Sequence, residues 1–320
     1  MASIERVPLG STGLMVPPIA VGCAELGSMP EAFAYTVSED DARATINAAL
    51  DSPLNYIDTA ALYGDGESER RVGLVLRERG GLPGDAILET KAGRDPKDNN
   101  YRVEIVKRRF ERSLELLGVD RVHNLFLHDA EWAPFEELMA PGGVVELLQG
   151  YKEAGVVGFL GVAAGPVDLS MQYVETDLFD LLITHNRFTL LNRTADPVHK
   201  EARRRGMAVL NAAPYGSGML AKGPDEYPRY AYQTAPAAMI ETTRKIADIC
   251  SRYGVPIAAA ALQFSMLDPN VDVTIVGMSK PERIQQTLDL ATVEIPPALW
   301  DELAELPTFE ADPEIGRFKQ

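Results

Sequence analysis

Residues 55–64 read NYIDTAALYG, and this stretch decides the fold because it joins a buried strand to two titratable groups. Its first four residues follow a helical segment and have the apolar pattern of a buried parallel strand. That strand ends at the carboxylate of Asp58, and the phenol of Tyr63 follows five residues later. A buried strand that ends in a carboxylate, with a phenol five residues later, needs a fold in which both polar groups have a role.

Short apolar runs of the same kind recur along the chain and alternate with helical patterns. The predicted strands are 19–22, 55–58, 86–91, 124–128, 159–163, 181–184, 208–213 and 273–277. The predicted helices are 39–51, 67–79, 102–117, 143–154, 167–176, 196–205, 235–252 and 281–290. Eight such units without a linker predict one α/β domain over residues 1–320, a (β/α)8 TIM barrel. The segment 6–17 predicts a β-hairpin before the first barrel strand.

Local signals support two of the predicted helices. Ser38 followed by Asp41 is typical of a helix N-terminus of the capping-box kind. The helix over 102–117 has one apolar face, and Gly118 ends it. The residues of that face are Val103, Val106, Phe110, Leu114 and Leu117.

Composition narrows the classes of function. The chain has 320 residues, 46% of them hydrophobic, and a formal net charge of −16, which disfavours binding to nucleic acid or an anionic membrane. We see neither a membrane-length apolar run nor the apolar core of a signal peptide at the start. Cys23 and Cys250 lie far apart and predict reduced thiols in a cytoplasmic protein. None of the four histidines falls in an HxH or HExxH pattern, so no metal is expected.

Titratable groups follow neighbouring predicted strands, at the end of a barrel where active sites form. Asp58, Lys91 and His128 each end a strand, and Tyr63 lies on the loop after the first of them. A neighbouring ammonium lowers the pKa of a phenol, and an aspartate keeps that ammonium charged. With a histidine to hold the substrate oxygen, the phenol could exchange a proton with that oxygen while hydride is transferred. No side chain supplies hydride, so such a site needs a cofactor.

Other interpretations of single residues remain open. Lys91 could form a Schiff base as in an aldolase, although Tyr63 and Asp58 would then lack matched roles. Trp132 is a candidate wall of the substrate pocket, and an interface or lid residue is the alternative. Cys23 is a second pocket candidate, with a small buried filler as its alternative. The remaining expectation is that His123 lies in a loop and His199 on a helix surface.

Six segments in order resemble the aldo-keto reductase superfamily over almost the whole chain. They are YIDTAALYGDGESERRVG, LETKAG, LGVDRVHNLFLHD, GVVGFLGVA, APYGSGML and IVGMSKPERI. The resemblance implies that Asp58, Tyr63, Lys91 and His128 form the catalytic tetrad. It also implies a nicotinamide cofactor, NAD or NADP, held without a Rossmann domain. GDGESERRVGLVL and NAAPYGSGML are most similar to the bacterial branch of D-threo-aldose (L-fucose) 1-dehydrogenases and pyridoxal dehydrogenases.

The same resemblance implies where the cofactor lies. The implied cofactor residues are Gly22, Asn186, Pro214, Tyr215, Gly216, Ser217, Gly218, Gly277, Met278, Ser279, Arg283 and Gln286. This chain departs from the family pattern at Ala163 and Ala164, which replace a Ser-Asn pair, and at Ala212, which replaces a stacking tyrosine. Gly277 and Met278 stand where NADP-preferring relatives carry a lysine and a serine or threonine, so NAD is slightly favoured.

The expected function is therefore an NAD(P)-dependent oxidoreductase acting on a small sugar, polyol or carbonyl compound, foremost an aldose 1-dehydrogenase. A general aldehyde or ketone reductase and a pyridoxal dehydrogenase are alternatives within the enzyme class. A redox sensor that binds the cofactor and regulates a partner is an alternative of another class. The expected assembly is a monomer or a small homo-oligomer.

Overall fold

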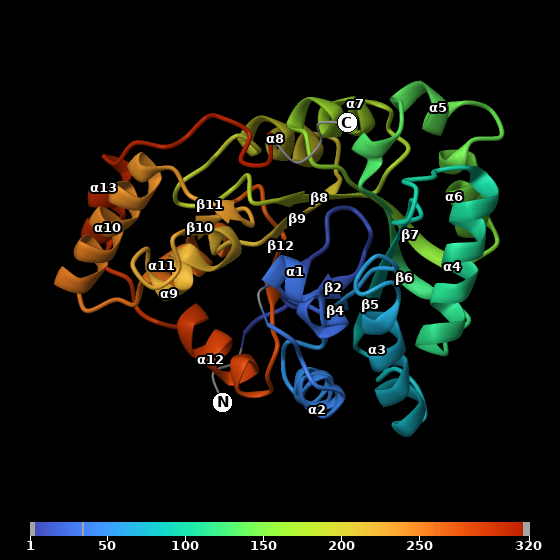
Figure 1. Cartoon of the computed structure of the whole chain (residues 1–320), viewed down its shortest axis with the longest axis horizontal. Coiled ribbons are helices and arrows are strands. Elements are labelled where there is room, and N and C mark those ends of the chain that lie inside the picture. The colour runs from blue at the N-terminus through green and yellow to red at the C-terminus, as the bar shows by residue number, and fades with distance from the viewer. Residues whose placement is uncertain (1–3, 34, 316–320) are drawn as a thin grey trace.

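Parallel strands form a closed barrel with helices around it (Figure 1). The computed structural model describes residues 4–33 and 35–315. The strands follow one another around the barrel as β12-β3-β4-β5-β6-β7-β8-β9. Their bounds are β3 Ile19–Gly22, β4 Tyr56–Asp58, β5 Ile87–Gly93, β6 Val122–His128, β7 Val157–Ala163, β8 Leu181–His185, β9 Ala208–Ala212 and β12 Val273–Gly277. The predicted (β/α)8 barrel is confirmed.

The predicted N-terminal hairpin closes one end of this barrel. Its strands β1 (Val7–Pro8) and β2 (Met15–Val16) pair antiparallel. Leu9 and Val16 are fully buried and pack with residues of the barrel interior. Because the hairpin covers the end where the strands begin, the chemistry is left to the opposite end.

The helices between the strands lie where the sequence pattern predicts them, to within two residues. They are α2 Glu39–Leu50, α3 Glu67–Glu78, α4 Val103–Leu117, α6 Val144–Glu153, α7 Val167–Glu175, α8 Asp196–Arg204, α10 Ala237–Arg252 and α12 Glu282–Ala291. Two further helices, α11 (Ile257–Met266) and α13 (Pro297–Ala304), were not predicted. The sequence of α11, IAAAALQFSM, is apolar nearly all round, so it carries no helical period to detect.

Short elements decorate the loops. They are η1 Glu25–Gly27, α1 Pro30–Phe33, η2 Ala130–Trp132, α5 Phe135–Met139, η3 Gly216–Gly218, α9 Met219–Lys222, β10 Arg229–Tyr230 and β11 Gln233–Thr234. β10 and β11 form a second small hairpin, in the long connection between β9 and β12. Loops of this kind, rather than the barrel strands, shape the entrance to the site.

The predicted helix ends are confirmed. The Oγ of Ser38 accepts a hydrogen bond of 3.0 Å from the backbone N–H of Asp41 at the start of α2. Gly118 follows α4 with a φ of 69°, and its N–H donates to the carbonyl of Leu114 at 2.9 Å. This left-handed conformation suits glycine and stops the helix there.

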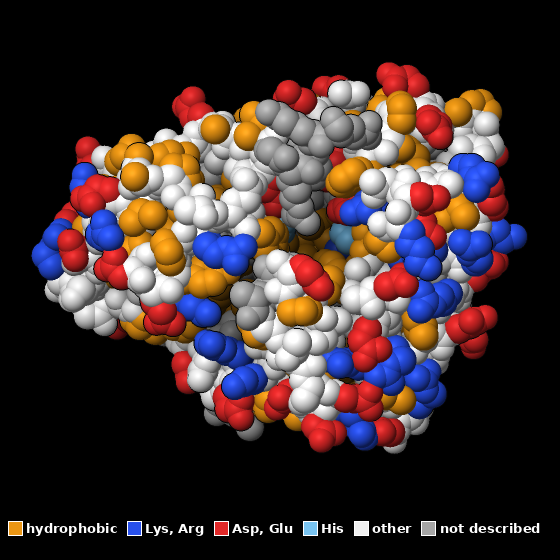
Figure 2. All heavy atoms as spheres, in the orientation of Figure 1, with side chains coloured by type: hydrophobic (Ala, Val, Ile, Leu, Met, Phe, Trp, Pro, Cys, Tyr) orange, Lys and Arg blue, Asp and Glu red, His pale blue; other side chains and the backbone are white. Residues whose placement is uncertain are grey.

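A hollow lies near the middle of the molecular face seen in Figure 2, with histidine visible at its floor. Polar and charged side chains surround it, together with apolar ones. Among the described residues, no helix is both long enough and apolar enough to cross a membrane.

Candidate active site

Three of the four proposed catalytic groups stand on neighbouring strands. Asp58 is the last residue of β4, and its register partner in β5 is Glu89, two residues before Lys91. His128 is the last residue of β6 and is paired with Gly93 at the end of β5. Because these strands are parallel, Asp58, Lys91 and His128 meet at the carboxyl end of the barrel.

Tyr63 reaches the same place from the loop after β4. The backbone N–H of Tyr63 donates to the carbonyl of Ala60 at 3.0 Å, so the loop turns back on itself. Arg109 of α4 holds this loop from outside, with one 3.0 Å hydrogen bond to the carbonyl of Ala61 and another to the carboxylate of Asp65. The position of the phenol is thus fixed by two structural elements, the loop and α4.

The ammonium of Lys91 links the group. It donates to the carboxylate of Asp58, to the carbonyl of Thr59 at 2.9 Å and to the hydroxyl of Tyr63 at 3.1 Å. The rings of Tyr63 and His128 meet edge to face, with centroids 5.9 Å apart. The side chains of Lys91 and Asp58 are 3% and 4% exposed, so their ion pair is shielded from water. The structure therefore brings together all four residues that the sequence singled out.

Burial sets the protonation of these groups. Burial alone would lower the pKa of Lys91, but Asp58, Tyr63 and Glu89 together outweigh it, so that pKa lies above its usual value. Burial also raises the pKa of Tyr63; Lys91 opposes this, as the sequence suggested, but the net shift is upward. Burial lowers the pKa of His128 to about 4, against the pull of Asp129. Near neutral pH the phenol is protonated and the imidazole is neutral.

A polar layer that the sequence analysis missed lies below the tetrad. Tyr56 donates a hydrogen bond to the carboxylate of Glu89, and the amide of Asn124 donates to both, at 2.8 and 3.0 Å. All three side chains are buried. Burial raises the pKa of Glu89 to about 8, and the charge of Asp58 adds to this. The available signal was a glutamate inside the otherwise apolar start of the strand AILETK.

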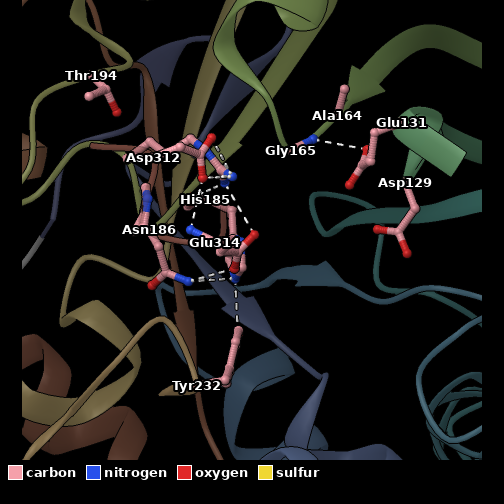
Figure 3. A network of polar contacts seen from close by, with 12 residues as sticks. Asp129, Glu131, Ala164, Gly165, His185, Asn186, Thr194, Tyr232, Asp312 and Glu314 are labelled. Atoms are coloured by element: carbon pink, nitrogen blue, oxygen red, sulfur yellow. Dashed lines mark hydrogen bonds and ion pairs between the residues drawn. The ribbon is translucent and has the colours of Figure 1, made fainter. Parts of the chain in front are cut away.

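One wall of the site follows His128 in the chain. The guanidinium of Arg94 stacks on Trp132, 4.5 Å from the ring centroid, and donates to Asp129 at 3.1 Å. The carboxylate of Glu131 accepts a 3.0 Å hydrogen bond from the backbone N–H of Gly165, after β7 (Figure 3). Trp132, the predicted pocket wall, therefore lies among charged side chains.

The C-terminal segment forms the opposite wall, which the sequence analysis also missed. Arg187, after β8, is buried and pairs with the carboxylate of Asp312 through bonds of 2.8 and 3.0 Å. The same guanidinium donates to Glu314 at 3.3 Å, and Glu314 is itself 1% exposed. Partners separated by more than a hundred residues in loops give no pattern that a sequence analysis can use.

Asn186 belongs to this wall (Figure 3). Its amide nitrogen donates to Glu314 at 3.3 Å and lies 3.1 Å from Nε2 of His185. Its amide oxygen accepts a 3.2 Å hydrogen bond from the hydroxyl of Ser217, and Nε2 of His185 lies 3.0 Å from the hydroxyl of Tyr232. The predicted cofactor residue Asn186 is thus engaged with neighbouring groups of the chain on every polar atom.

The predicted diphosphate loop, Pro214 to Gly218, has an irregular backbone. Positive φ angles occur at Ala213 (57°), Gly216 (57°), Ser217 (63°) and Gly218 (124°). Tyr215 packs against both main hydrophobic clusters. Burial raises its pKa, and the positive charge of the nearby Arg283 offsets only part of that increase. Such a loop, with little side-chain bulk, suits close approach of a diphosphate to the backbone.

The predicted adenosine segment begins at the exposed Gly277, the last residue of β12. Met278 is 1% exposed with its side chain in the core, and its N–H donates to the carbonyl of Gly22 at 3.2 Å. Arg283 and Gln286 are exposed and joined by a 3.1 Å hydrogen bond. Arg283 lies near Tyr215, so the two predicted cofactor segments are neighbours in space, and their residues fit a nicotinamide dinucleotide.

Two histidines differ from the sequence-based expectation, and the structure decides between the two interpretations of Cys23. Cys23 has no exposed surface and packs in the core, so it is a buried filler and not a pocket wall. His199 is also fully buried, with Nε2 2.6 Å from the hydroxyl of Thr184, because α8 turns it toward the barrel. His123 lies within β6 and not in a loop. No group of histidine, cysteine and acidic side chains in the described part of the chain could hold a metal ion.

A lysine-linked carboxylate and phenol at this end of a barrel suit proton exchange with a carbonyl or hydroxyl oxygen. A sequence model of the Aldo/keto reductase family matches residues 18–307, and the chain belongs to this family. Enzymes of the family use nicotinamide cofactors, generally NADP.

Relatives with assigned activities point to sugars and pyridoxal. D-threo-aldose 1-dehydrogenase from Pseudomonas sp is 32% identical over 332 residues, covering 95% of this chain and 98% of that protein. Pyridoxal 4-dehydrogenase from Microbacterium luteolum is 30% identical over 337 residues, covering 93% and 96%. The holo form of the aldo-keto reductase AKR11C1 from Bacillus halodurans shares the fold with a TM-score of 0.76 at 20% identity, covering 98% of this chain and all of that one.

Proposed function

We propose that this protein is an NAD(P)-dependent aldose 1-dehydrogenase, which oxidises a small cyclic sugar at its anomeric carbon to a lactone. The proposal rests on Lys91, whose ammonium contacts both Asp58 and the hydroxyl of Tyr63 at 3.1 Å. Such a pair supports a phenol that exchanges a proton with a substrate oxygen.

The residues of the chain have distinct tasks in this reaction. In its deprotonated form, which becomes more populated toward alkaline pH, the phenol oxygen of Tyr63 takes the proton from the anomeric hydroxyl as the C=O bond forms. Neutral His128 donates a hydrogen bond to the same oxygen, and Asp58 keeps Lys91 charged and in place. A nicotinamide held by the predicted cofactor residues would supply the acceptor for the hydride of the anomeric carbon. Reduction of a carbonyl is the reverse, with Tyr63 as the acid.

The walls of the site favour a substrate with several hydroxyl groups. Asp129 and His185 supply hydrogen-bond acceptors and donors near His128, Glu131 follows on the same loop as Asp129, and Trp132 offers one flat apolar surface. A polar wall of this kind suits a sugar better than a hydrophobic aldehyde, because desolvating carboxylates beside an apolar ligand is unfavourable.

The proposed cofactor is NAD or NADP, with NAD favoured. Gly277 has no side chain and that of Met278 is buried, so neither can hold a 2′-phosphate. Arg283 is exposed and remains available for that group, and a charged hydrogen bond of this type is worth roughly ten- to a hundredfold in binding. Dissociation constants for NAD+ and NADP+ with wild type and Arg283→Ala test this. A strong NADP+ preference that Arg283→Ala abolishes would contradict it.

The substrate is tested with a panel of aldoses, pyridoxal, pyridoxine and simple aldehydes, each with both cofactors, followed by NAD(P)H absorbance. The proposal expects aldoses to be oxidised fastest and a lactone to be the product. If aldoses are inert while hydrophobic aldehydes or ketones are reduced rapidly, the proposal is wrong and the protein is a general carbonyl reductase.

Two other functions are separated by the same panel. A pyridoxal dehydrogenase is the second candidate, motivated by the relative of that name. Tight cofactor binding with slow turnover on every compound would instead favour a redox-sensing regulator. We prefer a dehydrogenase to a regulator because the four residues of the proposed tetrad are arranged as proton transfer requires.

A further inference from the structure

The carboxyl group of Glu25 occupies the space in front of Gly277. Glu25 opens η1, just after β3, and Gly277 ends β12, the strand that pairs with β3. A Cβ atom built on Gly277 would lie 2.6 Å from Cδ and 2.7 Å from Oε2 of Glu25. Any side chain at position 277 would therefore have to displace this carboxyl group. The space that a side chain at position 277 would need is thus filled by the carboxyl group of a glutamate far away in the sequence.

One oxygen of this carboxyl group lacks a partner. Oε2 of Glu25 is buried and makes no hydrogen bond with the described residues. Burial raises the pKa of Glu25 to about 7; its own backbone N–H opposes that shift, and the charge of Asp58 adds to it. A buried acceptor without a donor is costly, and sites of this kind gain by binding a ligand that brings a donor.

The surroundings of Glu25 are those of the proposed adenosine site. Tyr35, on the same β3–α2 connection, hydrogen-bonds to Ser279 and is influenced electrostatically by Arg283 and by Glu25 itself. The connection therefore packs against the segment that starts at Gly277. Glu25 interacts electrostatically with Asp58 of the tetrad and with Tyr35 of this contact, and its carboxyl group lies in front of Gly277.

We propose that Glu25 is a specificity residue of the cofactor site: its free oxygen accepts a hydrogen bond from a hydroxyl of the adenosine ribose and disfavours a 2′-phosphate there. A ribose hydroxyl can donate to a carboxylate, whereas a phosphate is an anion with acceptors only. The charge of Glu25 therefore opposes that of Arg283, which alone would attract the phosphate. This inference rests on the proposed function, which places the adenosine end of the dinucleotide on residues 277–286.

The test is equilibrium binding by titration calorimetry, without any turnover. Wild type and Glu25→Gln are titrated with NAD+ and NADP+, and with 5′-AMP and adenosine 2′,5′-bisphosphate as fragments that isolate the 2′-phosphate. The measurement is made at about pH 8, where a carboxyl group with a pKa near 7 is ionised. Glu31→Gln is the matched control, because Glu31 is an exposed carboxylate on the same connection.

Glu25→Gln should shift the ratio of the two dissociation constants toward NADP+ by about tenfold or more, and the bisphosphate should show the same shift. Glu31→Gln should leave the ratio unchanged. Binding of both dinucleotides with the same ratio in wild type and Glu25→Gln would overturn the inference and leave the proposed function intact. Failure of wild type to bind either dinucleotide would instead overturn the proposed function.

Discussion

Replacing Lys91 by methionine tests whether its ammonium acts through charge. Methionine keeps an unbranched apolar stem of similar length but leaves the buried carboxylate of Asp58 without its cation. Removing one partner of a buried ion pair costs about 3–5 kcal/mol. Both side chains are at most 4% exposed, so little of this loss is recovered from water. The free energy of unfolding should fall by about that amount, and most of the turnover should be lost with it.

The double variant Asp58→Asn/Lys91→Met separates charge from packing. It removes both charges, so its loss of stability should be smaller than the sum of the single losses by about 1–3 kcal/mol. Urea unfolding followed by far-ultraviolet circular dichroism gives the three values. In parallel, borohydride reduction during turnover of wild type should trap no covalent adduct. Single losses that add to within about 0.5 kcal/mol, or a substrate-dependent adduct at Lys91, would refute the reasoning.

Further predictions concern the phenol, a buried histidine and the C-terminal segment. Tyr63→Phe should lower turnover by about 10²-fold or more while cofactor affinity changes little, and near-normal turnover of the variant would contradict its role. Oxidation by wild type should speed up toward alkaline pH, because burial raises the pKa of Tyr63. Burial lowers the pKa of His199 to about 3, so wild type should lose stability as the pH falls below about 6.5, where the histidine of the unfolded chain takes up a proton. Urea unfolding at about pH 7 and pH 5 should show a smaller loss of stability for His199→Gln than for wild type. An equal loss would argue against a neutral buried histidine. Arg187→Met should cost about 3–5 kcal/mol because it removes the guanidinium that pairs with the buried carboxylate of Glu314, and Asp312→Asn should cost less. Equal melting temperatures for both variants and wild type would show that the segment contributes nothing to stability.

The barrel was predictable because its signals are local. Each strand is a short apolar run bounded by turn residues, and each helix between strands has one apolar face, so the pattern alone places them. The meeting of Asp58, Lys91 and His128 followed from the same rule, since Asp58 and His128 end their strands and Lys91 lies two residues before the end of β5. Helix α11 escaped because its sequence has no polar face, and both sides of it are covered by other elements.

What could not be predicted depends on contacts between loops. Arg187 and Glu314 are 127 residues apart, and neither lies in a periodic segment. Glu25 meets Gly277 only because the barrel closes, and no spacing in the sequence encodes that meeting. The upward shift of the Tyr63 pKa could not be predicted either. The sequence indicated the neighbouring lysine, which lowers that pKa, but not the burial, which raises it by more.

The pairing of β3 with β12 has a consequence for how the protein is made. These strands come from opposite ends of the chain, and their register sets Gly22 beside Gly277. During synthesis the catalytic residues leave the ribosome long before β12 does, so the early strands wait as an open sheet with an unpaired edge. If the adenosine end binds where we propose, a dinucleotide in the cell cannot stabilise that intermediate, because the proposed site is completed only when the last strand is inserted. Chains that stop before residue 277 are therefore expected to depend on chaperones or to be degraded, however much cofactor is present.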